Sequence, residues 1–205
     1  MENYLKKISE DLLEINAIKL RMDNYFTWAS GLKSPIYCDN RKTLSYPKTR
    51  SFIKKEFAKI IKKKYPEVEM IVGVATGAIA HGVLLAEYLN LPFSYVRASA
   101  KGHGLQNLIE GEIKEKQKVL VIEDLISTGG SSLKAVEVLR KSKCEVLGML
   151  SIFSYGFEIA KQNFQKKNCE LTTLSDFNAL IKAALEKNYI NNEELEILKK
   201  WRKDF

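Results

Sequence analysis

One stretch of the chain, Val119 to Ser132, carries residue types that could bind a phosphorylated sugar. An apolar, β-branched run ends in two adjacent carboxylates, Glu123 and Asp124, and a loop of small and hydroxyl-bearing residues then leads into a helical pattern. A loop of this kind at a helix N-terminus binds phosphate, because free backbone N–H groups and the positive end of the helix dipole point at the anion. Carboxylates repel phosphate, so the pair must face another group, and the vicinal hydroxyls of a sugar are the natural partner.

Two other nucleotide-binding patterns are excluded for this stretch. No Gly-Lys-Ser/Thr ends the loop, as a Walker motif requires, and the Gly-x-Gly-x-x-Gly spacing of a dinucleotide fingerprint is absent. An ordinary buried strand followed by a capped helix would explain the apolar residues and Ser131. It would leave two carboxylates at the end of a buried strand without a purpose.

The apolar pattern of the chain predicts strands that alternate with helices. An amphipathic helix is expected over 4–15, irregular structure over 18–46, and a helix that Ser45 caps, with Pro47 in its first turn. Strands are expected at 70–74, 91–96, 119–122, 146–153 and 171–174, and two helices from 175 onward. This order predicts an α/β fold with a mostly parallel sheet covered on both faces, whose ligand lies at the carboxyl ends of the strands.

A second stretch lacks the apolar periodicity of its neighbours. Between Val96 and Lys118 the chain is polar and carries three glycines. A long polar loop in a compact domain is usually functional, and Arg97, Lys101 and His103 are spaced to converge on an anion as a lid. The alternative is a solvated surface loop whose charges are incidental.

Three segments, in the expected order, resemble those of one enzyme family. Residues 119–131 closely resemble the phosphoribosyl-pyrophosphate signature of the type I phosphoribosyltransferases. Residues 30–41 (SGLKSPIYCDNR) look like the N-terminal base-binding hood of orotate phosphoribosyltransferases, and 97–111 is similar to their mobile catalytic loop. The resemblance covers nearly the whole chain and is strongest to the shorter bacterial-type subgroup.

This resemblance implies a type I phosphoribosyltransferase fold, with a mostly parallel central sheet flanked by helices. A single domain over 1–205 would comprise an N-terminal helix and hood (1–46), a core (47–174) and C-terminal helices (175–205). The implied reaction joins orotate to 5-phosphoribosyl 1-diphosphate (PRPP), giving orotidine 5′-phosphate and diphosphate in UMP biosynthesis. The family also implies Mg²⁺, held mainly by PRPP with no direct protein ligand, and a homodimer in which the loop of one subunit reaches the active site of the other.

The resemblance also assigns the site residues. Arg97, Lys101, His103 and Asp124 are the expected catalytic residues, and Ser127 and Lys33 are expected to bind orotate, with Arg41 as a further candidate for its carboxylate. The residues expected to bind PRPP are Arg97, Lys101, His103, Glu123, Asp124, Leu125, Ile126, Ser127, Thr128, Gly129, Gly130 and Ser131.

The chain departs from the family pattern at several positions. Ala98 stands where many relatives carry a second cation, Gly77-Ala78 transposes a usual Ala-Gly, and no arginine follows the fourth core strand, where some relatives use one for orotate. The other histidine, His81, is expected to pack or to hydrogen-bond at a helix start. Trp28 and Tyr37 could stack on a base, although such residues are more often fillers of a small core.

Composition is consistent with a soluble enzyme of one domain. Hydrophobic residues make up 45% of the 205 and charged residues 28%. No apolar stretch is long enough for a membrane span, and the N-terminus lacks the apolar stretch of a signal peptide, so the cytoplasm is expected. Three cysteines, without metal-ligand spacing, are expected to be reduced.

The net charge of +8 is of the kind found in proteins that bind nucleic acid. The lysines are scattered along helix faces and the substrate itself carries several negative charges, so no nucleic acid is expected. Two alternatives stay open: a phosphoribosyltransferase for a purine base, and a regulator that keeps this fold and binds nucleic acid or PRPP as an effector.

Overall fold

The computed structural model describes residues 2–28, 31–99 and 108–204. Its central sheet has the strand order β10-β9-β8-β5-β6-β7, and all neighbouring strands are parallel except β6 and β7. The strands are β5 (Met70–Val74), β6 (Phe93–Val96), β7 (Ile109–Glu110), β8 (Lys118–Ile126), β9 (Glu145–Ser154) and β10 (Leu171–Asp176). The predicted parallel α/β architecture is confirmed.

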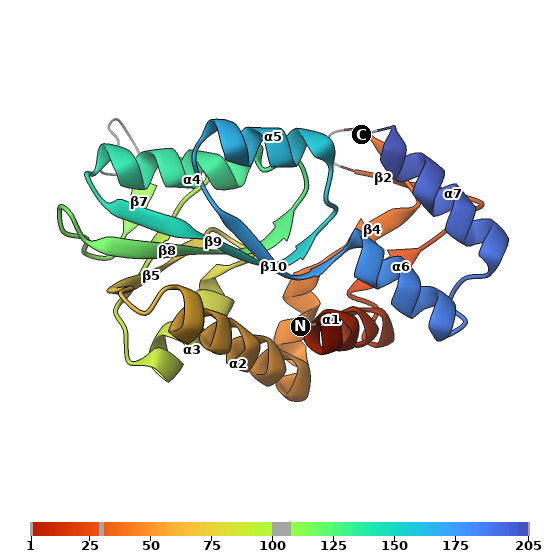
Figure 1. Cartoon of the computed structure of the whole chain (residues 1–205), viewed down its shortest axis with the longest axis horizontal. Helices are drawn as coiled ribbons and strands as arrows, with labels where there is room; N and C mark the ends of the chain where they lie inside the picture. Colours follow the sequence, from red (N-terminus) through yellow and green to blue (C-terminus); the bar gives the residue numbers. More distant parts are fainter. Residues whose placement is uncertain (1, 29–30, 100–107, 205) are drawn as a thin grey trace.

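Helices cover both faces of this sheet (Figure 1). One face carries α4 and α5, the other carries α1, α2 and α3, and α6 and α7 lie beside the sheet together with the N-terminal strands. The helices are α1 (Glu2–Glu14), α2 (Pro47–Lys64), α3 (Ile79–Leu89), α4 (Gly130–Lys141), α5 (Glu158–Lys166), α6 (Phe177–Glu186) and α7 (Asn192–Lys203).

Burial explains why the apolar runs form strands. All five residues of β5 are buried, and so is 119–122 in β8. Central strands of a parallel sheet are apolar throughout because helices cover both their faces. The helices bury one stripe each: Leu133, Val136 and Leu139 of α4 recur every third residue and are 4% exposed or less.

Residues 18–45 form a small structure of short strands. β1 (Ile18–Leu20) pairs with β4 (Ile36–Cys38), β2 (Phe26–Thr27) pairs with β3 (Lys33–Ser34), and the 3-10 helix η1 spans Asn40–Ser45. These elements, called the hood below, are more regular than the irregular segment that we expected. Antiparallel partners two or three residues long leave no periodicity for a sequence pattern to reveal.

Three expectations about the helices and strands need correction: the N-cap of α2, the absence of a helix at α5, and the end of β8. Tyr46, not Ser45, is the N-cap of α2, because η1 continues to Ser45 and the Tyr46 N–H bonds the Thr43 carbonyl. The sequence pattern also missed α5, which is only nine residues long and buries just Ala160 and Phe164.

The third correction concerns the acidic pair. Glu123 and Asp124 do not end their strand, because β8 runs on to Ile126. The neighbouring β9 runs on to Ser154, so the ladder continues with Leu125 opposite Phe153 and Ile126 opposite Ser154. Glu123 and Asp124 therefore lie near the end of a paired strand but still within it. Pairing holds their backbone more rigidly than a loop would.

The strand order fixes where a ligand can lie. After β5 the chain adds β6 on one side, and it then returns to place β8 on the other side of β5. The loops after β5 and β8 therefore diverge to opposite faces of the sheet, and parallel sheets bind ligands in the crevice that opens at such a point.

Two adjacent glycines at the start of α4 offer a matched test of this local structure. Gly129 has φ +78°, and a Cβ there would lie 2.6 Å from the ring of Phe164, whereas a Cβ on Gly130 would meet nothing closer than 3.8 Å. We expect Gly129→Ala to lower the free energy of unfolding by roughly 1–3 kcal/mol. Gly130→Ala should change the free energy of unfolding by less than about 1 kcal/mol, and we expect that change to be an increase. Urea denaturation of both variants measures this; equal effects would contradict the left-handed turn at Gly129.

Candidate functional site

A cleft of about 590 Å³ lies at the carboxyl ends of β5, β6 and β8. Four parts of the chain line it: the hood, the loop after β5, the end of β6, and β8 together with the start of α4. The lining residues used below are Cys38, Asp39, Arg41, Thr76, Gly77, Arg97, Glu123, Asp124, Leu125, Ser131 and Lys134. The cleft thus forms where the strand order predicts a ligand.

Asp124 is fixed in this cleft by close contacts on two sides. Its carboxyl group lies directly against the α-carbon of Gly77, so closely that a Cβ at Gly77 would overlap it. On the hood side, the Asp124 backbone carbonyl accepts a 2.6 Å hydrogen bond from Asn40 Nδ2. The side chain is half-buried, and as a hydrogen-bond acceptor it is suited to sugar hydroxyls.

Glu123 differs from Asp124 because its carboxyl group already has partners within the protein. One oxygen accepts the Asp124 N–H at 2.9 Å and the other accepts the Ser132 hydroxyl at 2.8 Å. The residue is 6% exposed, and burial, with the neighbouring Asp124, raises the pKa of Glu123 well above its ordinary value of 4.5. The two acids, which the sequence presents as a pair, therefore have different surroundings.

The start of α4 is arranged as an anion site. Gly129 is its N-cap, and this residue has no side chain that could bond the first N–H groups of the helix. Gly130 and Ser131 are exposed at this end, and both Ser131 and Lys134 line the cleft. Unpaired N–H groups and the helix dipole favour a phosphate at this position.

Two cationic side chains that line the cleft form ion pairs with acidic neighbours. Arg97 Nη1 lies 3.1 Å from Glu110 Oε1, and the Arg97 N–H bonds the Leu108 carbonyl at 2.8 Å. In the hood, Arg41 Nε donates to Asp39 Oδ1 at 2.6 Å, and this bond holds the pKa of Asp39 below its usual range. Arg41, Arg97 and Lys134 line the cleft together with three acidic residues, Asp39, Glu123 and Asp124.

The structure brings together some of the predicted site residues and separates others. Arg97, Glu123, Asp124, Leu125 and Ser131 line the cleft. The residues between Leu125 and Ser131 do not line it: Ile126 ends β8, 127–129 form the turn, and Gly130 begins α4. Lys101 and His103 lie outside the described residues.

Lys33 lies on the exposed side of the hood. Its Nζ donates to Thr27 Oγ1 at 2.7 Å across the β2–β3 pair, and Lys33 does not line the cleft. Arg41, the alternative candidate for the orotate carboxylate, does line it. The sequence places both residues in one segment and cannot tell which of them faces the ligand.

The remaining histidine and aromatic residues have clear places. His81 is buried and lies 3.0 Å from Thr43 Oγ1, which confirms a hydrogen bond at the helix start. Trp28 packs 4.8 Å from the ring centre of Tyr155 and donates its indole N–H to the Ile36 carbonyl, so it fills a small core. Tyr37 is 39% exposed beside Phe26.

Several cleft residues were not predicted as site residues. Lys134 could have been found, since it lies one helical turn after Ser131 and so on the same face of α4. Cys38 and Asp39 belong to the segment that resembles the hood and Thr76 follows β5, but the sequence does not show that these side chains line the cleft.

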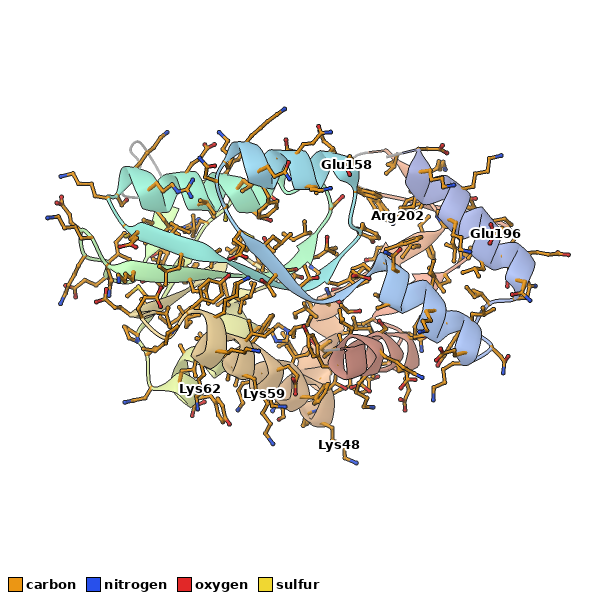
Figure 2. The ribbon with its side chains drawn as sticks, in the orientation of Figure 1. Lys48, Lys59, Lys62, Glu158, Glu196 and Arg202 are labelled. Atoms are coloured by element: carbon orange, nitrogen blue, oxygen red, sulfur yellow. The ribbon has the colours of Figure 1, made fainter. Side chains whose placement is uncertain are left out.

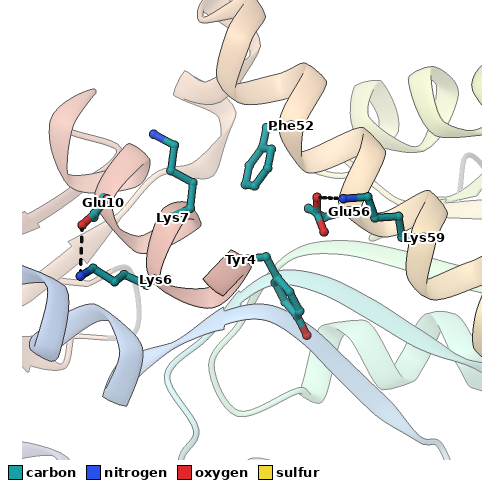
Figure 3. A pocket seen from close by; sticks show the side chains of 7 residues that line it. All are labelled: Tyr4, Lys6, Lys7, Glu10, Phe52, Glu56 and Lys59. Atoms are coloured by element: carbon teal, nitrogen blue, oxygen red, sulfur yellow. Dashed lines mark hydrogen bonds and ion pairs between the residues drawn. The ribbon is translucent and has the colours of Figure 1, made fainter. Parts of the chain in front are cut away.

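A second depression, between α1 and α2, is lined by ion pairs (Figure 3). Lys59 bonds Glu56 at 2.6 Å and Lys6 bonds Glu186 at 2.6 Å, so its cations are already neutralised. Other lysines of α2, including Lys48 and Lys62, project outward (Figure 2). The positive charge of this face is therefore dispersed or paired, in contrast to the cleft.

Comparison with known proteins agrees with this site. The family model described as "Phosphoribosyl transferase domain" matches residues 47–186. That range includes β5, β8, α4 and the loops between them, which form most of the cleft. The chain belongs to the phosphoribosyl transferase domain family.

Similar proteins narrow the comparison further. The chain is 57% identical to an orotate phosphoribosyltransferase of Porphyromonas gingivalis over 99% of this chain and 97% of that protein. It is 51% identical to one of Listeria innocua, over 97% and 95%. The crystal structure of orotate phosphoribosyltransferase from Aeropyrum pernix is similar with a TM-score of 0.77 and 26% identity, covering 90% of this chain and 99% of that one. An adenine phosphoribosyltransferase from Leishmania tarentolae shares the fold, with a TM-score of 0.63, 19% identity, and coverage of 85% and 90%.

The burial of Glu123 predicts a pH-dependent stability difference. Below about pH 4.5 the carboxyl is protonated in both folded and unfolded chains, so its pKa shift costs nothing there. As the pH rises above that value, the unfolded chain ionises first and folding loses stability, up to about 1.4 kcal/mol per pH unit, until the folded pKa is passed. Glu123→Gln removes this loss, so its free energy of unfolding should rise relative to the native protein between pH 4.5 and 8.

Denaturation curves at several pH values measure this difference. Glu137→Gln is the control, because an ion pair with Lys167 lowers the pKa of Glu137 and no such rise should follow. A Glu123→Gln difference that stays flat with pH would show that the carboxyl ionises normally.

Proposed function

We propose that this chain transfers the phosphoribosyl group of PRPP to orotate, giving orotidine 5′-phosphate and diphosphate in UMP biosynthesis. The observation that carries the proposal is the cleft in which the carboxylate of Asp124 and the open N-terminus of α4 lie together. The choice of orotate as the accepting base rests on relatives that are more than 50% identical over almost the whole chain and are named orotate phosphoribosyltransferases.

The ribose and its phosphate fit this arrangement in one orientation. The 5′-phosphate binds at the start of α4, where residues 127–131 offer backbone N–H groups and hydroxyls. Asp124 then accepts hydrogen bonds from the ribose hydroxyls, and Glu123 supports the Asp124 backbone through the bond to its N–H. Leu125 and Ile126 contribute through their place in the strand that joins these two sites.

Charge development during transfer explains the need for cations. Bond-breaking at the anomeric carbon gives the ribose positive charge and the leaving diphosphate negative charge. Arg97, Lys101 and His103 neutralise the diphosphate, with Lys101 or His103 as candidate proton donor, and closure of their segment excludes water. The Arg97–Leu108 backbone bond ties the two ends of that segment together beside the cleft.

The donor set of the cleft fits a magnesium ion carried by the substrate. Mg²⁺ keeps several waters and binds substrate phosphates in sites of this kind, so in this proposal PRPP holds it without a direct protein ligand, and Asp124 in the cleft is left for the ribose hydroxyls. Within 2–28, 31–99 and 108–204, no three His, Cys, Asp or Glu side chains are grouped to hold a metal. When bound, Mg²⁺ supplies electrophilic stabilisation at the diphosphate oxygens.

Orotate is placed on the hood side of the cleft, next to the anomeric carbon. Ser127 and Lys33 are the proposed orotate residues, and Arg41 is the cation of the hood that lines the cleft. Arg41 has a partner in Asp39, so its guanidinium is held in one orientation before orotate arrives.

The wider setting is also proposed. Residues 1–205 act as one domain, with an N-terminal helix and hood (1–46), a core (47–174) and a helical tail (175–205). The domain forms a cytoplasmic homodimer with shared active sites, with neither nucleic acid nor membrane as partner. None of the helices described is both long and apolar enough to cross a membrane.

A spectrophotometric assay of orotate consumption tests the function. We expect orotate to be consumed only when PRPP and Mg²⁺ are both present, and adenine, hypoxanthine and uracil to be poor substrates. Preference for a purine base would support the purine enzyme. Absence of turnover, with DNA or RNA binding that falls steeply with salt, would support the regulator instead.

The role of Lys101 is tested by removing its charge. Lys101→Ala should lower kcat by roughly a hundredfold or more, because it removes a cation that acts on the leaving group in the transition state. Lys114→Ala, which removes an exposed lysine further along the chain, is the matched control and should keep the native kcat. If Lys101→Ala turns over at a near-native rate, Lys101 has no part in the mechanism.

A further inference from the structure

A series of buried hydrogen bonds runs behind the cleft wall and ends at Asp124. The Asp124 backbone carbonyl accepts a 2.6 Å bond from Asn40 Nδ2. The backbone carbonyl of the same Asn40 accepts a 2.5 Å bond from Thr43 Oγ1, and Thr43 Oγ1 lies 3.0 Å from His81 Nε2. Asn40 and Thr43 are completely buried and His81 is 3% exposed.

The direction of these bonds follows from the number of hydrogens. A hydroxyl has one hydrogen, and Thr43 donates it to the Asn40 carbonyl, so Thr43 must accept from His81. His81 therefore carries a hydrogen on Nε2. Burial lowers the pKa of His81 to about 4, although the charge of Asp124 acts in the opposite direction. The imidazole stays neutral at the pH of the cell.

We propose that Asn40, Thr43 and His81 are positioning residues for phosphoribosyl transfer: their hydrogen bonds hold the backbone of Asp124 so that its carboxylate is aimed into the cleft. The inference rests on the function proposed above, in which Asp124 orients the ribose hydroxyls. None of the three residues lines the cleft, so each acts through Asp124.

The geometry explains why Asp124 needs support from this side. The bonds join η1, the first turn of α3 and the end of β8, which are far apart in the sequence. Gly77 closes off the other side of the Asp124 carboxyl group. Asp124 is thus held between the loop after β5 and the hood, and a displacement of about 1 Å at such a group can cost up to about a hundredfold in rate.

A pair of substitutions at Thr43 tests the inference. Thr43→Val keeps the shape and loses the hydroxyl, whereas Thr43→Ser keeps the hydroxyl. We expect Thr43→Val to lower kcat/KM for PRPP by about tenfold or more and Thr43→Ser to stay within about threefold of the native value. Native kcat and KM in a folded Thr43→Val protein would overturn the inference.

Loss of a buried hydroxyl elsewhere is the control for stability alone. Ser9 Oγ is buried between Ser175 Oγ and the Leu5 carbonyl, outside the cleft. Ser9→Ala should lower the melting temperature while leaving kcat and KM unchanged. If Ser9→Ala and Thr43→Val alter the kinetics equally, the effect of Thr43 is a general loss of stability and the inference fails.

A double-mutant cycle separates this inference from the proposed function. Asp124→Asn alone should weaken turnover, and native kinetics in that variant would refute the proposed role of Asp124. If Thr43 acts through Asp124, adding Thr43→Val to Asp124→Asn should lower kcat/KM by no more than about twofold further. Effects that multiply would show that Thr43 acts independently of Asp124, and the inference would be wrong while the proposed function stood.

A second variant and a spectrum keep the inference testable if Thr43→Val does not fold. His81→Leu leaves the Thr43 hydroxyl bonded to Asn40, so a smaller loss of about threefold or more is expected, again absent in the Asp124→Asn background. The ¹⁵N NMR spectrum of the native protein should show neutral His81 protonated at Nε2. Protonation at Nδ1, or native kinetics in His81→Leu, would overturn the proposed hydrogen-bond chain.

Discussion

The site depends on the placement of one carboxylate between two segments that are far apart in sequence. Asp124 lies against Gly77 on one side and hydrogen-bonds Asn40 through its backbone on the other. The contact with Gly77 follows from the pairing of β8 with β5, which brings the end of β8 to the loop after β5, whereas the bond from Asn40 requires the hood to fold against β8. A residue with a side chain at position 77 would displace the carboxylate, so the small residue there is part of the site.

The position of Asp124 on β8 also determines how far its carboxylate lies from the start of α4. The N-terminus of α4 follows β8 by only three residues, so the same strand that positions Asp124 also positions the helix start. A ligand with a diol and a phosphate separated by a short, rigid ring can reach both. Arg97, directly after β6, lines the cleft from the far side of β5 and adds a cationic side chain there.

Neighbouring acids in this site serve different purposes. Glu123 is buried, accepts the hydroxyl of Ser132 at the start of α4, and has a raised pKa, so it joins β8 to the helix. Asp124 remains accessible in the cleft. A buried carboxyl that is fully hydrogen-bonded costs less than one left without partners, which explains why Glu123 can be accommodated in an otherwise apolar strand.

Much of this protein followed from its sequence alone. The apolar runs at 70–74 and 119–122 and the glycine- and hydroxyl-rich turn after them were enough to predict the parallel sheet, the family and most of one wall of the cleft, because period and turn chemistry are local properties. Tertiary structure alone decided which hood residue faces the cleft, the separate surroundings of Glu123 and Asp124, and the buried chain from Asn40 through Thr43 to His81. The bonds from Asn40 to Asp124 and between Thr43 and His81 join residues that are 84 and 38 positions apart. No local pattern encodes such contacts, since they exist only once the hood has folded against the sheet.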